Sequence, residues 1–219
     1  MSRIYVSTSW KNAHQPQLVE ALRKHGHKVY DFRHPFGRDD RNVWERVCGV
    51  LGLFAKFFAG QLTPEDFSKM LSSDIAQERF HEHFDAMQDA DTCILLLPCG
   101  ASSHSEAGFM KGLGKRVFVL DTRQAVEPEL MYLIHDGYTY DQDDIIEWVS
   151  QPIPGICRVC GCSDYNPCRN PHYGNCSWVD EEHTLCSHCA DLVDGDWSCK
   201  DDPDTVHCVN DRSNAFDFG

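Results

Sequence analysis

Two runs of the chain are apolar at nearly every position, residues 91–98 (DTCILLLP) and residues 115–121 (KRVFVLD). A strand with one face in water alternates apolar with polar residues, whereas a continuously apolar strand is covered on both faces. Such strands are typical of a parallel sheet, because its crossover connections place helices over both faces. These two runs constrain the fold more than any other feature of the sequence.

Segments with the helical spacing of apolar residues separate further strand-like runs. Residues 3–9 and 27–32 predict two more strands, and residues 138–140 predict a short last one. The helical patterns lie at residues 16–26, 42–60, 63–73, 75–88, 104–114 and 142–151. Strands that alternate with helices favour an α/β fold with a doubly wound parallel sheet, and we expect the flavodoxin-like strand order.

The cysteines are distributed unevenly along the chain. Of the 12 cysteines, three precede residue 157 and nine lie at or after it. Residues 150–156 (SQPIPGI) contain two prolines and suit a linker. The sequence therefore predicts an α/β domain over residues 1–150 and a small C-terminal Cys-rich metal-binding domain with an acidic tail over residues 157–219.

The formal net charge is −14, and the part from Cys157 onward carries 12 acidic against four basic residues. No basic stripe is present to follow a phosphate backbone, which disfavours nucleic acid as a partner. The N-terminus lacks the long apolar segment of a signal peptide. The most apolar stretch, residues 43–62, is interrupted by charged residues and predicts no membrane span. We therefore expect a cytoplasmic protein.

The tail contains two Cys-x-x-Cys pairs, Cys157/Cys160 and Cys186/Cys189. Without a secretory signal, dense cysteines indicate metal before disulfides, and two such pairs predict a tetrahedral structural zinc site. A metal would fold a segment too small to build its own core. The remaining candidates could form a second site, or the set could hold an iron–sulfur cluster. These candidates are Cys162, Cys168 and Cys176, with His172, His183 and His188 nearby.

A lone carboxylate, Glu106, follows the first apolar run within residues 99–108 (CGASSHSEAG). Ligands of parallel sheets bind beyond the carboxyl ends of the strands, near the point where the strand order reverses. In the first turn of the next helix Glu106 would face that crevice, and the helix dipole would favour its ionised form. The alternative is a capping-box partner of Ser103, with no chemical role.

Five stretches together carry a resemblance to a known family. They are residues 4–12 (IYVSTSWKN), 26–35 (GHKVYDFRHP), 84–98 (FDAMQDADTCILLLP), 100–120 (GASSHSEAGFMKGLGKRVFVL), and Trp44 with 63–73 (TPEDFSKMLSS). In order and spacing they resemble the nucleoside 2-deoxyribosyltransferase family, including its relatives that hydrolyse deoxynucleoside monophosphates. The resemblance implies cleavage of the N-glycosidic bond of a small-molecule nucleoside or nucleotide. It further implies a covalent glycosyl-Glu intermediate, from which water or a second nucleobase releases the sugar.

By this resemblance Glu106 is the catalytic nucleophile. Asp85 is the acid that orients the nucleophile or handles the proton of the base, with Asp89 and Asp91 as rivals for that role. The resemblance also implies substrate contacts on both lips of the crevice and beside the base pocket. The implied substrate-binding residues are Ser9, Trp10, Lys11, Asn12, Asp31, Ser102 and Ser103.

The chain departs from the small members of this family in two ways. A helical insertion occupies residues 36–84, approximately, and we expect it to act as a lid or as the contact of a homo-oligomer. The Cys-rich tail is the second departure. Two other functions stay open: a nucleotide-binding sensor without turnover, and an NAD glycohydrolase that uses the same carboxylate.

Overall fold

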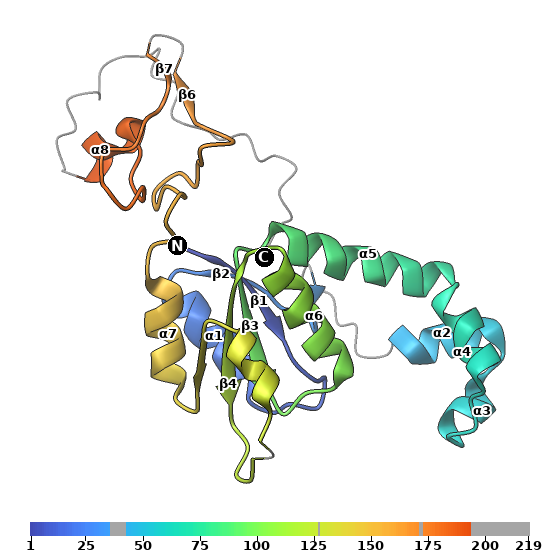
Figure 1. Cartoon of the computed structure of the whole chain (residues 1–219). Coiled ribbons are helices and arrows are strands. Elements are labelled where there is room, and N and C mark those ends of the chain that lie inside the picture. The colour runs from blue at the N-terminus through green and yellow to red at the C-terminus, as the bar shows by residue number, and fades with distance from the viewer. Residues whose placement is uncertain (36–42, 127, 171–172, 194–219) are drawn as a thin grey trace. The chain divides into compact units, whose positions relative to one another are not determined.

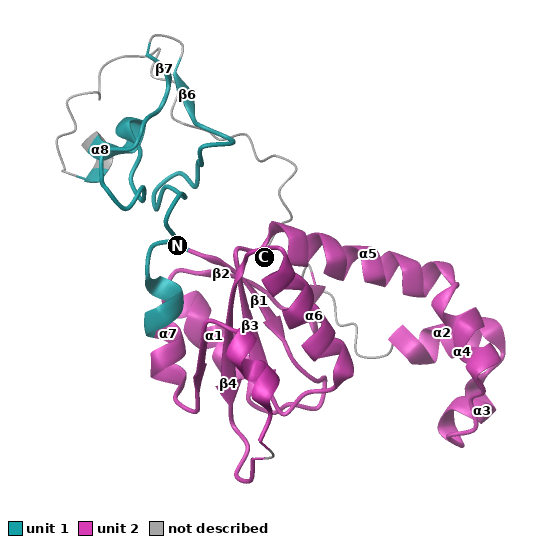
Figure 2. Cartoon of the chain, in the orientation of Figure 1, with its two compact units in different colours: residues 1, 147–215 teal, residues 2–146, 216–219 magenta. Residues whose placement is uncertain are grey.

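The computed structural model describes residues 1–35, 43–126, 128–170 and 173–193, which fall into two compact units (Figure 2). One unit is built on residues 2–146 and contains the sheet. The other is built on residues from Glu147 onward. The helix α7, Gln142–Ser150, begins in the first unit and ends in the second.

The sheet has five strands in the order β2-β1-β3-β4-β5, and every neighbouring pair is parallel (Figure 1). The order reverses between β1 and β3, which places the switch point there. The predicted α/β class and flavodoxin-like order are confirmed. The strands are β1 (Arg3–Ser7), β2 (Lys28–Tyr30), β3 (Thr92–Leu97), β4 (Arg116–Asp121) and β5 (Gly137–Thr139).

The helices α5 (Asp74–Asp89) and α6 (Ala101–Gly112) pack on one face of the sheet. Their buried Ala86 and Met110 share a core with Tyr5 and other alternate strand residues. Because successive side chains of a strand point to opposite faces, residues such as Ile4 and Val6 supply the other face. The helix α1 (Gln15–Lys24) adds its buried apolar stripe to the core of the unit.

A helical extension leads into α5 and has a small core of its own. It comprises α2 (Val43–Leu51), α3 (Phe54–Phe58) and α4 (Pro64–Leu71). The single helix expected over residues 42–60 is two helices, because Gly52 adopts a positive φ of 68° that L-residues rarely take. A capping box of Thr63 and Asp66 starts α4. After α4 the chain forms α5, which packs on the sheet.

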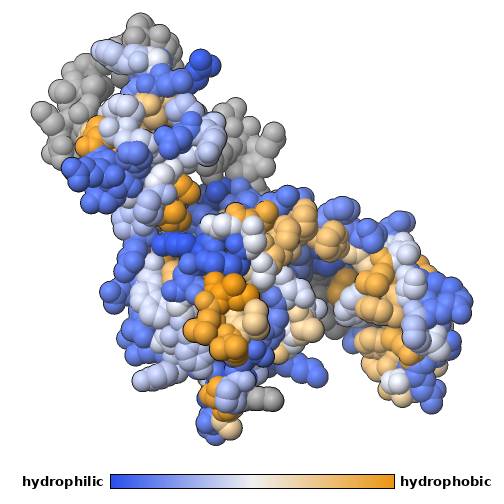
Figure 3. Space-filling view, in the orientation of Figure 1, coloured by the Kyte–Doolittle hydropathy of each residue, from blue (hydrophilic) through white to orange (hydrophobic). Residues whose placement is uncertain are grey.

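The extension exposes several large apolar side chains, of which Val50 (73%) and Phe58 (67%) are the most accessible. A second apolar patch lies on the short 3₁₀ helix η2 (Leu130–Ile134), where Leu133 is 81% exposed. Figure 3 shows apolar surface over both segments. Patches of this kind often mark protein contacts, and the homo-oligomer stays a prediction. Within the described part of the chain, every helix is too short or too polar to cross a membrane.

The tail unit has little regular structure. It contains the antiparallel pair β6 (Arg169–Asn170) and β7 (Gly174–Asn175), and the helix α8 (Ser187–Val193). Its core consists mainly of cysteine side chains, with Leu185, Trp178 and Ala190 packed against them. So few apolar residues cannot by themselves hold a fold of this size.

Candidate functional site at the carboxyl edge of the sheet

Ser7, the last residue of β1, contacts α6, which is the first helix after β3. The buried hydroxyl of Ser7 donates a hydrogen bond to the carboxylate of Glu106 and also lies 3.2 Å from the carbonyl oxygen of Ser103. The hydroxyl of Tyr5, two residues earlier on the same face of β1, also bonds Glu106. Both donors come from the strand next to the switch point, so the carboxylate lies where a parallel sheet binds its ligands.

The position of Glu106 in its helix differs from the prediction. The helix α6 begins at Ala101 rather than at residue 104, so Glu106 lies in the second turn, and the first turn contains no acidic residue. The N-cap is Gly100, and no side chain caps the helix. Glu106 is therefore not the capping-box partner of Ser103. The helix dipole also contributes little there, because its effect falls off within the first turn.

Burial governs the protonation of this carboxyl group. It raises the pKa of Glu106, while the hydrogen bonds from Ser7 and Tyr5 act in the opposite direction. Burial and the nearby Glu106 charge raise the pKa of Tyr5 well above its ordinary value, so this hydroxyl stays protonated and remains a donor. The site thus holds a largely desolvated carboxylate in a fixed orientation.

Aromatic rings form a wall beside this carboxylate. Tyr5 and Tyr30, which are neighbours in the β1–β2 register, stack with ring centroids 5.5 Å apart. Trp10 meets Phe32 edge to face at 5.0 Å. His83 of α5 lies against Tyr30 at 5.9 Å and against Phe32 at 6.4 Å. Tyr5, Tyr30 and Phe32 are buried in the core, so Trp10, which is 37% exposed, is the accessible ring among these tyrosine, phenylalanine and tryptophan side chains.

The loop between β1 and α1 is held from two sides. The buried side-chain amide of Asn12 donates to Thr8 Oγ1 (3.1 Å) and to the carbonyl oxygen of Pro98 (3.2 Å), and its oxygen accepts from the backbone of His14 (3.0 Å). Arg33 Nη2 donates to the carbonyl oxygens of Ser9 (3.2 Å), Trp10 (2.7 Å) and Asn12 (2.7 Å). This role of Arg33 was not predicted, because a single arginine after a strand does not indicate which carbonyl groups it will bind.

The other predicted substrate-binding residues differ in accessibility. Lys11 and Ser102 are exposed, and Ser9 is half-buried. Ser103 is buried with 4% exposure and lies under the first turn of α6. Asp31 follows β2 and accepts hydrogen bonds from Gln15 Nε2 (2.8 Å) and the Arg33 backbone (3.0 Å).

The acidic candidates on α5 and directly after it make no described hydrogen bond to Glu106. Asp89 pairs with Arg3 (2.6 Å), and Asp91 accepts from the backbone of Arg3 (3.0 Å). Arg3 starts β1, so these two acids lie at the amino edge of the sheet, opposite the Glu106 site. Asp85 is exposed one turn before Asp89. Among the described residues, neither a hydrogen bond nor an ion pair joins Asp85 to Glu106.

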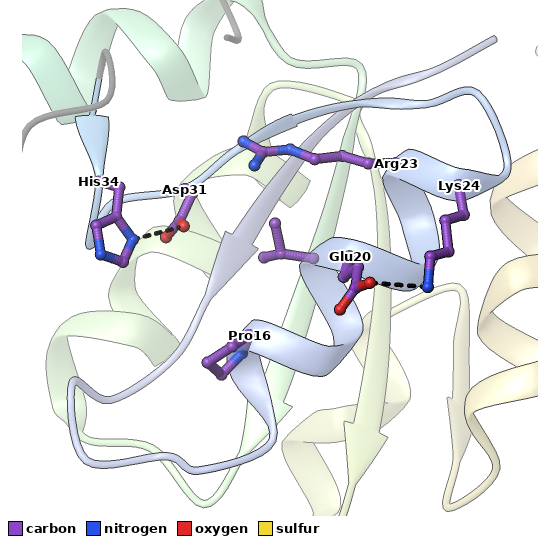
Figure 4. Close-up of a pocket in the computed structure, with 7 residues that line it drawn as sticks. Pro16, Glu20, Arg23, Lys24, Asp31 and His34 are labelled. Carbon is purple, nitrogen blue, oxygen red and sulfur yellow. Dashed lines mark hydrogen bonds and ion pairs between the residues drawn. The ribbon is translucent and has the colours of Figure 1, made fainter.

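An open groove of about 500 Å³ lies beside α1 and the end of β2 (Figure 4). Asp31 and His34, whose Oδ2 and Nδ1 are 3.1 Å apart, line one side of it. Glu20 and Lys24 form an ion pair of 2.7 Å on the other. Glu106 does not line this groove, so the groove is distinct from the Glu106 site.

The described cysteines of the tail form one cluster. In the chain as a whole the structure describes ten cysteines, and all ten are free thiols. Two groups of four place their sulfur atoms within 4.8 Å of one another, so the cluster could hold a metal ion. The first group is Cys157, Cys160, Cys162 and Cys186, and the second is Cys162, Cys168, Cys176 and Cys186. Cys189, the fourth ligand of the predicted zinc site, is fully buried beside them. Cys199 and Cys208 lie outside the described residues.

No family model and no curated protein sequence matches the chain. Among solved structures, the 2-deoxyribosyltransferase of Bacillus psychrosaccharolyticus is similar over 66% of this chain and 90% of that protein, with 18% identity and a TM-score of 0.43. A CMP N-glycosidase of Clostridium botulinum is similar over 68% and 99%, with 12% identity and a TM-score of 0.35. A response regulator of Thermotoga maritima is similar over 68% and 96%, with 18% identity and a TM-score of 0.34. Proteins of unrelated activity reach similar values, so these similarities select no function.

Proposed function

We propose that this chain cleaves the N-glycosidic bond of a nucleoside or nucleoside monophosphate, or transfers its 2-deoxyribosyl group, with Glu106 as the nucleophile. The observation that carries the proposal is the carboxylate itself. It is half-buried at the carboxyl edge of a parallel sheet and is held by Ser7 and Tyr5. Both donors described for Glu106 are hydroxyl groups rather than cations.

The chemistry follows from this arrangement. A Glu106 oxygen attacks the anomeric carbon while the bond to the base nitrogen breaks, and the base leaves with the bonding electron pair and takes a proton. The resulting glycosyl ester is opened at the same carbon by water, which gives free sugar, or by a second base, which gives a new nucleoside. A carboxylate suffices because the transition state resembles an oxocarbenium ion. Ser7 and Tyr5 fix the attacking oxygen, and the accessible ring of Trp10 is the proposed contact of the base.

Other residues are assigned by their accessibility. Lys11 and Ser102 are exposed and are free to contact a 5′-phosphate or 5′-hydroxyl group, together with the half-buried Ser9. Trp10 is 37% exposed and is therefore accessible to a ligand. We assign Asn12 and Ser103 to holding the two loops rather than to substrate contact, because both are buried. Asp85 stays the proposed acid for the base, and its contact with a ligand would have to form on binding.

A panel of nucleosides, nucleoside monophosphates and NAD, monitored for free base, tests the proposal. Glu106→Gln should lower turnover by a factor on the order of 10³ or more, as expected for loss of a covalent nucleophile. The matched control is Glu20→Gln, an exposed acid on α1. Wild type incubated with substrate should gain the mass of a pentosyl group, and Glu106→Gln should not.

Each alternative function predicts a different result. A variant that keeps activity within a few-fold of wild type would overturn the role of Glu106. Saturable nucleotide binding with no release of base would identify the sensor. Release of nicotinamide from NAD, with no release from other substrates, would identify the NAD glycohydrolase.

We further propose that the tail is a zinc-folded appendage with a structural role. The seven cysteines of the tail that the structure describes are free thiols in one cluster, and five of them are buried. Thiolates favour zinc in tetrahedral sites. Removal of the metal should unfold the tail, since apolar residues contribute so little of its core. Metal analysis of the purified full chain, with visible absorption to detect an iron–sulfur cluster, distinguishes the two metals.

A further inference from the structure

Seven thiols form the core of the tail, three more than one tetrahedral ion can use. Neighbouring sulfur atoms are 3.6 Å apart between Cys162 and Cys176, 3.6 Å between Cys168 and Cys186, and 3.8 Å between Cys160 and Cys186. Four sulfur ligands at about 2.3 Å from a zinc ion lie about 3.8 Å from one another at the corners of a tetrahedron. The cluster is therefore already spaced for coordination along several edges.

Cys186 is central to the cluster. It belongs to both groups of four, and its sulfur lies at the tetrahedral edge distance from Cys160 of the first group and Cys168 of the second. Cys162 also belongs to both groups, but its sulfur lies 3.6 Å from Cys176, which belongs only to the second group. We therefore place Cys162 with the second group.

This placement leaves the first group one ligand short. We assign Cys189 to complete it, because its thiol is fully buried in the same core. Two tetrahedral ions need eight ligands, or seven if one ligand is shared. Seven thiols are present, and Cys186 lies at the tetrahedral edge distance from a member of each set. Cys160 and Cys168, which belong to different sets, lie 3.9 Å apart.

Backbone N–H groups point at sulfur atoms in both sets. Cys157 accepts from the backbone of Cys186 (3.4 Å) and of Cys160, and Cys162 accepts from the backbone of Cys168. Such hydrogen bonds stabilise thiolates and orient metal ligands. Both halves of the cluster therefore have the supporting contacts expected around a metal-bound thiolate.

We propose that the tail holds two metal ions in one thiolate cluster, with Cys186 as a ligand shared between them. The first ion takes Cys157, Cys160, Cys186 and Cys189, and the second takes Cys162, Cys168, Cys176 and Cys186. The inference rests on the proposed metal-folded tail and does not depend on the chemistry of Glu106. His188 is the competing ligand for the second ion, since its Nδ1 lies 3.6 Å from Cys168 Sγ.

Native mass spectrometry and zinc analysis of the full chain test the stoichiometry. Wild type should carry two zinc ions. Cys176→Ala and Cys189→Ala should each leave one, Cys186→Ala should retain fewer than one, and His188→Ala should retain two. Cys48→Ala, which removes a buried thiol from the other unit, is the control and should retain two.

One ion in wild type would overturn the two-ion cluster while leaving the metal-folded tail standing, and no ion would overturn both. Two ions in wild type, with one lost in each of Cys186→Ala and His188→Ala, would show two separate sites. Bound iron with visible absorption would also overturn the proposal.

A measurement on wild type avoids any folding defect of the variants. In the chain loaded with ¹¹³Cd, a shared sulfur should give two resonances that are split by coupling through Cys186. Two unsplit resonances would overturn the sharing.

Discussion

The hydroxyl of Ser7 donates a hydrogen bond to the carboxylate of Glu106, 99 residues later in the chain. One partner ends β1 and the other lies in the second turn of α6, so the sheet itself brings them together. The proposed attack by Glu106 depends on this contact, because the hydroxyl of Ser7 orients the carboxylate.

Ser7→Ala should move the acid limb of the pH profile. The reaction needs ionised Glu106, so activity is lost as pH falls through the pKa of this residue, which burial already raises. Loss of a hydrogen bond to the charged form of Glu106, roughly 1.5–3 kcal/mol, should raise that pKa further. The acid limb of kcat/KM should therefore shift to higher pH. The control is Ser105→Ala, which changes an exposed serine on the helix that carries Glu106. An acid limb that stays at the wild-type pH in Ser7→Ala would contradict the role of Ser7.

Glu106→Gln should leave stability at neutral pH unchanged or increase it. A raised pKa means that the folded state binds the proton more readily than the unfolded state. The free energy of unfolding therefore falls as pH rises through the interval between the unfolded and folded pKa values. A neutral amide removes this cost. Thermal unfolding as a function of pH measures it, and a variant that is several degrees less stable at neutral pH would contradict the argument.

Lys11→Ala should weaken the reaction of nucleoside monophosphates and spare that of nucleosides. One charge-assisted contact to phosphate is worth roughly 1.5–3 kcal/mol, which corresponds to a loss of roughly 10- to 100-fold in kcat/KM. Lys69→Ala, an exposed lysine of the helical extension, serves as the control. Equal losses on both substrate classes would show that Lys11 does not recognise phosphate.

Arg33→Lys should loosen the loop that carries Ser9 and Trp10. The guanidinium reaches three backbone carbonyl oxygens through Nη2, and an ammonium group on a different stem cannot reproduce that geometry. We expect a free energy of unfolding lower by about 1–3 kcal/mol and a higher KM for all substrates, with kcat affected less. Steady-state kinetics and thermal unfolding check this. A loss confined to phosphorylated substrates would mean that Arg33 binds the ligand directly.

Asp121→Asn should destabilise the sheet unit. Hydrogen bonds from Arg123, and then from the Tyr138 hydroxyl, lower the pKa of the buried Asp121 to about 2. Its contribution is present above the unfolded pKa and is lost as pH falls from about 4 toward 2. The variant should lose on the order of 2 kcal/mol at neutral pH, and the difference from wild type should shrink below pH 3, approximately. Denaturant unfolding at several pH values measures this.

The regular elements could be read from local patterns. Residues 91–98 and 115–121 predict buried strands, and β3 and β4 lie within them. The capped pattern of residues 63–73 likewise gives α4. Each of these depends on side chains within one turn or one strand, which is information that a sequence contains directly.

The environment of Glu106 could not be read in the same way. The expected start of α6 was wrong by three residues, because an extended Gly100 lets the helix begin immediately after it. The alternative of a capping contact with Ser103 is wrong, and Glu106 instead accepts from Ser7, which depends on how β1 and β3 align in the sheet. The roles of Arg33 and Asn12 depend on backbone carbonyl oxygens of other segments, which no residue pattern specifies.

The sequence by itself predicted the α/β class, the concentration of cysteines in the tail and Glu106 as the candidate nucleophile, of which the last stays a prediction. Apolar periodicity and cysteine spacing are local, and they bound the fold without reference to distant contacts. Only the tertiary structure decided which groups hold Glu106, which acids lie at the far edge of the sheet, and how seven thiols share one core. These depend on contacts between residues far apart in the chain, because hydrogen bonding and burial act through space rather than along the sequence.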